Sequence, residues 1–289
     1  MFFASADLSM TDLFRCERAG TAVGYGFLWG IGGLMFGLSM RYLGVALGQS
    51  VSLGTCSAFG TLIPAWLSGT DFCHGDGLVL LAGVVITLAG IAIIGYAGVM
   101  RSKDAKTNAT LSPARDFAIA KGLCVALVAG VMSSCFALGI DAAQPVKEVV
   151  SSRGVHPLFA GLPSIFLVTV GGFVSNAIYC VYQHVKNKTG KEYWQNSASV
   201  SLCNILFSSL AGLLWYSQFF CLEIGRSFLS SSPVLLAFSW SILMSLNVIY
   251  SNLWGIILKE WRGCNRRTLL TLLFGLLVLV FSIFFPAFF

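Results

Sequence analysis

Long apolar stretches alternate with short polar segments along almost the whole chain. A helix needs about 20 mostly apolar residues to cross roughly 30 Å of hydrocarbon. Stretches of about this length without Asp, Glu, Lys or Arg cover residues 19–40, 42–70, 77–100, 122–140, 157–183, 193–222, 227–258 and 268–289. Runs such as residues 78–81 are apolar on every side, whereas membrane strands alternate between apolar and polar residues. The pattern predicts an all-α integral membrane protein with eight transmembrane helices.

The composition excludes a soluble globular protein. Of 289 residues, 56% are hydrophobic and 10% are charged, against about 25% charged in an ordinary soluble domain. Six of the nine cysteines lie inside apolar stretches and lack CxxC spacing, so we interpret them as small buried hydrophobic residues. They are Cys56, Cys124, Cys135, Cys180, Cys203 and Cys221.

The distribution of basic residues predicts the orientation of the chain. If each stretch crosses the membrane, 13 of the 18 Lys and Arg residues fall on one side and 5 on the other. The positive-inside rule makes the richer side cytoplasmic. Both termini are then extracytoplasmic in the inner (plasma) membrane.

One long polar and basic segment, residues 101–121, predicts a cytoplasmic linker between two parts of the chain. Residues 21–100 before it hold three spans, and residues 122–289 after it hold five. Residues 1–20 form an extracytoplasmic segment that lacks the basic start of a signal peptide. We expect that this segment is not the natural beginning of the protein.

Glycines recur in the first span, at Gly24, Gly26, Gly30, Gly32, Gly33 and Gly37. Small residues let membrane helices approach closely. The stripe therefore predicts dense helix packing. The alternative is that the glycines let the helix bend or line a cavity.

Amide side chains lie inside several spans, where an unpartnered polar group is unfavourable. They are Gln49, Asn176, Asn204, Gln218, Asn247 and Asn252. Each could form a hydrogen bond between helices. Together with Trp29, Trp215, Trp240 and Trp254 they also fit a cavity that binds a polyhydroxylated ligand. For each Trp the alternative is a position in an interfacial aromatic belt.

Charged residues flank two of the spans. Glu223 and Arg226 lie one helical turn apart, between the sixth and seventh stretches. They form either an interfacial ion pair or, if Glu223 faces a cavity, a site for a transported proton. Asp141, followed by Gln144 and Lys147, presents the same alternatives at the end of the fourth stretch.

Enzymatic function is not indicated. The chain has no HExxH, GxSxG or P-loop pattern, and its three histidines fall in predicted loops. Cys73 and His74 with Asp71 and Asp76 make too short a turn for a metal site of fixed geometry. We predict no catalytic residue, metal or cofactor, and no nucleic-acid partner.

Several segments resemble the L-rhamnose-proton symporter family of the drug/metabolite transporter superfamily, in order and spacing. They are Trp29-Gly30-Ile31-Gly32-Gly33, residues 37–44, Ala142-Ala143 with Pro145, residues 154–158, Leu162-Pro163-Ser164, residues 215–220, and residues 251–261. Leu28-Trp29 and Leu214-Trp215 occupy corresponding places in the two halves. The resemblance runs from about Gly24 to the C-terminus.

The resemblance implies about ten helices in two inverted repeats with a substrate site between them. Eight spans then represent an incomplete version that lacks the first two helices. The implied function is import of L-rhamnose or a related sugar with a proton, by alternating access. The implied substrate-binding residues are Trp29, Trp215, Gln218, Trp240 and Asn252, with Glu223 as the proton carrier.

The seventh span departs from the family pattern of Tyr-Asp, Ser-Trp and His-Met. This chain has Leu235-Leu236, Ser239-Trp240 and Leu243-Met244, so it lacks the acid and the imidazole. The alternatives are therefore a transporter of another small metabolite within the superfamily, or a non-transporting remnant.

Overall fold

A computed structural model describes residues 9–107, 119–195 and 197–289, and in these ranges the chain forms helices and no strand. Within these ranges, eight helices are long and apolar enough to cross a membrane, which confirms the predicted fold class. They are α2 (Ala19–Leu43), α3 (Val45–Leu67), α4 (Gly75–Thr107), α5 (Ile119–Ala142), α7 (Leu162–Asn187), α9 (Ala198–Phe228), α10 (Pro233–Ile257) and α11 (Arg266–Phe284).

Short helices fill the connections. They are α1 (Met10–Arg15), α6 (Gln144–Ser152), α8 (Glu192–Gln195) and the 3-10 turns η2 (Pro157–Phe159), η3 (Thr189–Lys191) and η4 (Phe285–Phe288). Most of the predicted 101–121 linker lies outside the described residues, as do the first eight residues of the N-terminal segment.

Local sequence explains where the long helices begin and end. Gly44 separates α2 from α3 with φ of +82°, a left-handed backbone that glycine adopts without a steric penalty. Ser232 caps α10 because its side chain accepts a hydrogen bond from the Leu235 N–H, and Pro233 occupies the first turn, where its missing N–H is no loss.

The prediction that Glu223 and Arg226 lie between two spans is wrong. Helix α9 continues through both residues to Phe228. Charge alone does not end a helix, and here opposite charges from α6 and α9 meet, so the carboxylate at Glu223 is compensated inside the bundle.

Helix α2 packs against α5 and α7 through three of its glycines. A Cβ atom added at Gly26 or Gly30 would meet α7, and one at Gly32 would lie 2.7 Å from the Ser133 backbone nitrogen of α5. These three positions carry the close packing that the stripe predicts. A Cβ atom added at Gly24, Gly33 or Gly37 would meet no atom of another helix within 4 Å among the described residues.

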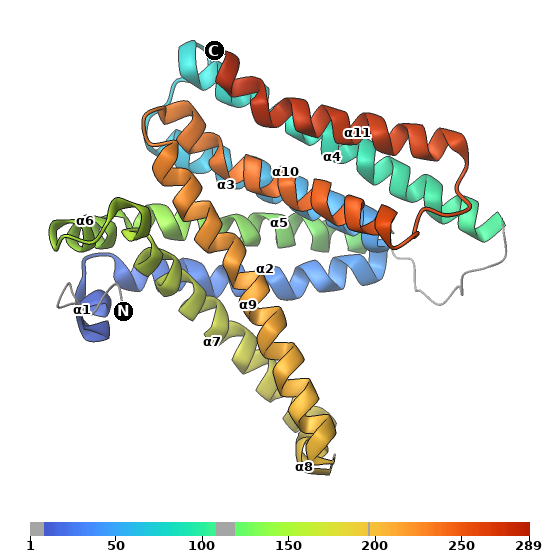
Figure 1. Ribbon diagram of the computed structural model, residues 1–289, viewed down its shortest axis with the longest axis horizontal. Coiled ribbons are helices and arrows are strands. Elements are labelled where there is room, and N and C mark those ends of the chain that lie inside the picture. The colour runs from blue at the N-terminus through green and yellow to red at the C-terminus, as the bar shows by residue number, and fades with distance from the viewer. Residues whose placement is uncertain (1–8, 108–118, 196) are drawn as a thin grey trace.

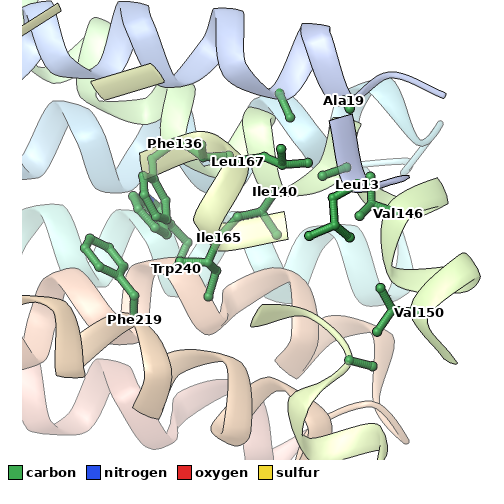
Figure 2. Packing of buried hydrophobic residues seen from close by; sticks show 14 of the residues in the cluster. Leu13, Ala19, Phe136, Ile140, Val146, Val150, Ile165, Leu167, Phe219 and Trp240 are labelled. Carbon is green, nitrogen blue, oxygen red and sulfur yellow. The ribbon is translucent and has the colours of Figure 1, made fainter. Parts of the chain in front are cut away.

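The remaining helices pair across the molecule. Helix α11 packs along α4, and α10 packs against α3 and α4 (Figure 1). The contact between α4 and α11 includes Ile91, Ile94 and Leu279. A larger apolar cluster lies where α2, α5, α7, α9 and α10 meet, around Phe136, Phe219 and Trp240 (Figure 2).

Helix α9 is the least enclosed of the long helices. Together with α7 it extends away from the other helices toward α8 (Figure 1). None of the residues in its most apolar stretch is buried, and Phe207 is 71% exposed. In a bilayer this surface faces lipid, which is as apolar as a leucine side chain.

The cysteine prediction holds only in part. Cys56 and Cys135 are buried, whereas Cys124, Cys180, Cys203 and Cys221 are exposed. Apolar residues in a membrane protein are equally suited to the lipid face and to the core, so an apolar stretch does not distinguish the two.

Candidate functional site

Five aromatic rings from four helices form one cluster at the centre of the bundle. Trp29 of α2 stacks on Trp215 of α9, with ring centroids 5.7 Å apart and planes 18° apart. Trp29 also meets the Phe136 ring of α5 edge-on at 4.8 Å. Phe136 stacks on Phe219 of α9 at 4.4 Å and on Trp240 of α10 at 5.6 Å.

Glycines and one backbone carbonyl hold the indole rings in place. The Trp240 Nε1–H donates to the Cys56 carbonyl of α3 at 3.2 Å, and its ring lies where a Cβ atom of Gly60 would be. The ring of Trp29 occupies the corresponding space beside Gly172 of α7. Small residues on α3 and α7 thus make the room that the large rings require.

The cluster is closed on its inner side and open along α9. Phe136, Phe219 and Trp240 are at most 4% exposed, whereas Trp215 is 49% exposed. No space for a ligand separates the stacked rings in this conformation. A ligand that binds between them requires α9 to move.

One amide, Gln218, lies beside Trp215 on α9, and a second, Asn247 of α10, lies against it. The Asn247 side-chain amide of α10 reaches Oε1 of Gln218 on α9 at 3.5 Å and donates to the Leu243 carbonyl at 3.0 Å. The Gln218 amide donates to the Trp215 carbonyl at 3.0 Å. Both side chains therefore have hydrogen-bonding capacity that an incoming hydroxyl group could use.

Asn252 lies more than a turn beyond Asn247, and its amide bonds to Val248 of its own helix at 2.8 Å. The structure therefore brings Trp29, Trp215, Trp240 and Gln218 together and places Asn252 farther along α10. Asn176 instead links helices, donating to the Gly30 carbonyl of α2 at 3.4 Å.

A buried charge cluster lies one turn farther along α9. Glu223 is 1% exposed, and its Oε1 accepts a hydrogen bond from the Lys147 ammonium of α6 at 2.8 Å. The Arg226 Nε lies 4.0 Å from Oε2 of Glu223, while Nη1 donates to Ser239 of α10 at 2.9 Å. The carboxylate also contacts Gly161, where a Cβ atom would displace it.

Hydroxyl groups join α3 to α10. Ser241 lies 2.9 Å from the Ser57 hydroxyl and 2.8 Å from that of Thr61. Ser245, one turn along α10, is fully buried, and its hydroxyl has no partner among the described residues. These contacts form a polar seam between two otherwise apolar helices.

In the turn between α3 and α4, the Asp71 side chain accepts local hydrogen bonds. The Asp71 carboxylate accepts the Cys73 N–H at 2.9 Å and contacts Nδ1 of His74 at 3.0 Å. These bonds hold the pKa of Asp71 below its ordinary value of 3.8, with the backbone bond from Cys73 the larger cause. In the described ranges, no three His, Cys, Asp or Glu side chains gather as metal ligands would.

Two hollows lie away from the aromatic cluster. One of about 440 Å³ lies between α3 and α4, beside Ser50, Gly54 and Tyr96. One of about 360 Å³ lies between α10 and α11, beside Lys259, Trp261 and Leu272.

Sequence reasoning missed Phe136, Phe219 and Lys147. The two phenylalanines are among 23 in the chain, so residue type alone does not single them out. The sequence places Lys147 six residues after Asp141 and does not show that it pairs with Glu223. A four-residue interval between Phe219 and Glu223, which places both on one face of α9, is the signal that could have linked the rings to the charges.

Comparison with known proteins gives a consistent result. A family model described as L-rhamnose-proton symport protein (RhaT) matches residues 14–285. L-rhamnose-proton symporters of Yersinia pestis (strain Pestoides F) and Yersinia pseudotuberculosis serotype O:1b (strain IP 31758) are each 34% identical over 263 residues. The match covers 89% of this chain and 74% of each relative. No solved structure matches the chain.

Proposed function

The chain belongs to the L-rhamnose-proton symport family, and from this we propose that it is a secondary transporter that imports L-rhamnose with a proton. The observation that carries the proposal is the family match over residues 14–285. The aromatic cluster between α2, α5, α9 and α10, with Gln218 beside Trp215 and Asn247 against Gln218, supports it independently. It is a membrane transport protein, and we assign it no enzymatic step.

We propose that the sugar binds between the rings of Trp29, Trp215 and Trp240. A sugar ring presents apolar C–H faces, which suit indole surfaces, and hydroxyl groups, which suit amides. Gln218 would bond those hydroxyl groups directly, with Asn247 orienting it from α10. Asn252 would meet the sugar farther along α10.

We further propose that α2–α4 and α9–α11 are related units of an inverted repeat. If every long helix crosses the membrane, α2 is the first span and α9 the sixth, so they run in opposite directions. Corresponding members of the two units meet: α2 and α9 at Trp29 and Trp215, α3 and α10 at Ser57 and Ser241, and α4 and α11 at Ile94 and Gly275. Relative movement of the two units would open the site on alternate sides.

Glu223 is our proposed proton carrier. It is a carboxylate 1% exposed, one turn beyond Phe219 on α9, and it contacts Lys147 of another helix. Buried acids inside transporter bundles are typical members of proton relays. Glu223→Gln should abolish accumulation of sugar while sparing exchange of sugar for sugar. The control is Glu148→Gln, an exposed acid on α6, which should transport normally.

The decisive experiment is uptake of labelled L-rhamnose by cells that lack their own transporter, with and without a protonophore. Uptake that collapses with the protonophore supports proton symport. If the protein is present in the membrane and no uptake occurs, the substrate is another small metabolite, as the leucines at positions 236 and 243 would favour.

A further inference from the structure

Two buried side chains on one face of α9 join this helix to the rest of the molecule. They are Phe219 and Glu223, one turn apart. The Phe219 ring stacks on Phe136 of α5 and meets the Trp215 ring of its own helix edge-on. Glu223 makes the ionic contact with α6. A change at Glu223 therefore acts on the part of α9 that closes the aromatic cluster.

The ionic contact depends mainly on Lys147. Its Nζ lies 2.8 Å from Oε1 of Glu223, whereas Arg226 approaches only to 4.0 Å and uses Nη1 to bond Ser239. The Nε of Arg226 has no hydrogen-bond partner in the described part of the chain. Lys147 is thus the direct partner of the carboxylate.

The two partners differ in access to water. The side chain of Glu223 is 1% exposed and that of Lys147 is 31% exposed. If the carboxylate becomes neutral, the ammonium can turn to solvent and keep its charge hydrated, because a lysine stem is flexible. The buried Glu223 side chain cannot reach solvent in the same way, so we expect Lys147 to be the side chain that moves when the pair separates.

The other groups around the carboxylate do not replace this contact. Arg226 is on the same helix and moves with it. Asp141 of α5 is a charged group near Arg226, but the printed contacts of the guanidinium are to Ser239 and Glu223. Gly161 and Ser239 contribute no charge.

We propose that Lys147 is a positioning residue that couples protonation of Glu223 to the release of α9 from α6. This rests on the proposed function of Glu223 as the proton carrier. A proton from water binds a carboxylate oxygen of Glu223, the attraction to the Lys147 ammonium is lost, and α9 moves away from Phe136. The same contact, when re-formed on deprotonation, closes the cluster.

The experiment measures opening directly, without transport. The native cysteines are replaced, Ser164→Cys is introduced at the buried start of α7, and the purified protein is placed in lipid nanodiscs. Ser164 is 2% exposed and bonds to the Ala143 carbonyl between α5 and α6. It lies three residues after Gly161, which the Glu223 carboxylate contacts, so we expect a hydrophilic maleimide to reach it faster when α9 leaves this end of α7. Ser151→Cys, on the exposed side of α6, corrects for the dependence of thiol chemistry on pH.

Relative to the Ser151→Cys control, labelling at position 164 should rise as the pH falls, by about tenfold if the open state is a minor one at neutral pH. Glu223→Gln and Lys147→Gln should each make labelling fast at every pH. Lys147→Arg, which keeps the charge, should retain the dependence on pH. Because Lys147→Arg keeps an ion pair with Glu223, slow labelling of this variant at neutral pH separates loss of the contact from loss of folding.

Labelling that is equally slow at every pH in all backgrounds would overturn the proposal, as would a Lys147→Gln protein with the wild-type dependence on pH. The labelling result and the uptake result test the two proposals separately. If labelling depends on pH and on Lys147 but L-rhamnose is not taken up, the coupling of Glu223 to α9 is supported and L-rhamnose is excluded as the substrate. If uptake is driven by protons but labelling does not depend on Lys147, proton symport is supported and the proposed role of Lys147 is wrong.

Discussion

At the scale of single residues, the exposed half of the aromatic cluster offers the cleanest test of sugar binding. Trp215→Ala removes the ring that stacks on Trp29, while the ring is already 49% exposed, so little core packing is lost. A stacking contact is worth about 0.5–1.5 kcal/mol. We expect KM for the sugar to rise about twofold to tenfold, measured from initial rates of uptake.

The matched control is Trp254→Ala. Trp254 is 60% exposed and lies near the end of α10, as a tryptophan of an interfacial belt would. An equal change in KM for both variants would contradict the placement of the sugar at Trp215.

Residue type predicted part of this site and not the rest. Tryptophans and amides inside apolar spans are rare enough to single out Trp29, Trp215 and Gln218. Phe136 and Phe219 have ordinary residue types, and only their position against other helices gives them a role. The ion pair between Glu223 and Lys147 joins residues far apart in the chain, so no local pattern could reveal it.

At the scale of the helices, close backbone contact between α2 and α7 is a second testable feature. In Gly171→Ala the added methyl group would lie against the backbone of Val23 and Phe27. Overpacking of this kind destabilises by about 1–3 kcal/mol. We expect a lower yield of folded protein and a lower Tm, measured by thermal unfolding in detergent.

Gly33→Ala is the control, since a Cβ atom added at Gly33 of α2 would meet no atom of another helix within 4 Å among the described residues. Alanine favours helix over glycine by about 1 kcal/mol, so this variant should be at least as stable as the wild type. If Gly171→Ala proves equally stable, α2 and α7 are not in backbone contact.

The turn that joins α3 and α4 predicts a dependence on pH. The folded state lowers the pKa of Asp71, so the stabilisation is present above the ordinary carboxyl pKa of 3.8 and is lost as the pH falls below it. Asp71→Asn should lower Tm at pH 7, and the difference from the wild type should shrink at pH 3. A difference that grows toward pH 3 would contradict this stabilisation by Asp71.

Most of the helices could be predicted, because hydrocarbon imposes both their length and their composition. The ends were less certain. Helix α9 passes through Glu223 and Arg226 because charges from another helix compensate them, and this depends on tertiary structure. The break between α5 and α6 at Ala143, just before Pro145, follows from a backbone effect that hydropathy does not register.

At the scale of the whole molecule, the orientation in the membrane is a prediction of the charge distribution. If the side with more Lys and Arg is cytoplasmic, both ends of the chain lie outside the cytoplasm. A reporter fused after Phe289 that is active only outside the cytoplasm should therefore be active. A second fusion, after Lys259 between α10 and α11, should be inactive with that reporter, and the reverse result would invert the topology.

How the helices pair could not be read from hydropathy. Helices α4 and α11 lie far apart in the chain, yet they share the contacts of Ile91, Ile94 and Leu279. Lipid-facing and helix-facing sides are equally apolar in such spans, so the pattern that orients a soluble helix is absent. The family resemblance, through its repeats, was the only indication at this scale.

The length of α9 makes its inclination depend on the thickness of the membrane. With 31 residues at about 1.5 Å each, the helix measures about 46 Å, whereas the hydrocarbon layer is about 30 Å thick. It fits by inclining, as it does relative to the bundle in Figure 1, and its neighbours hold it mainly near Phe219 and Glu223. A thinner bilayer favours a larger inclination, so the acyl-chain length of the surrounding lipids should set how readily the site opens.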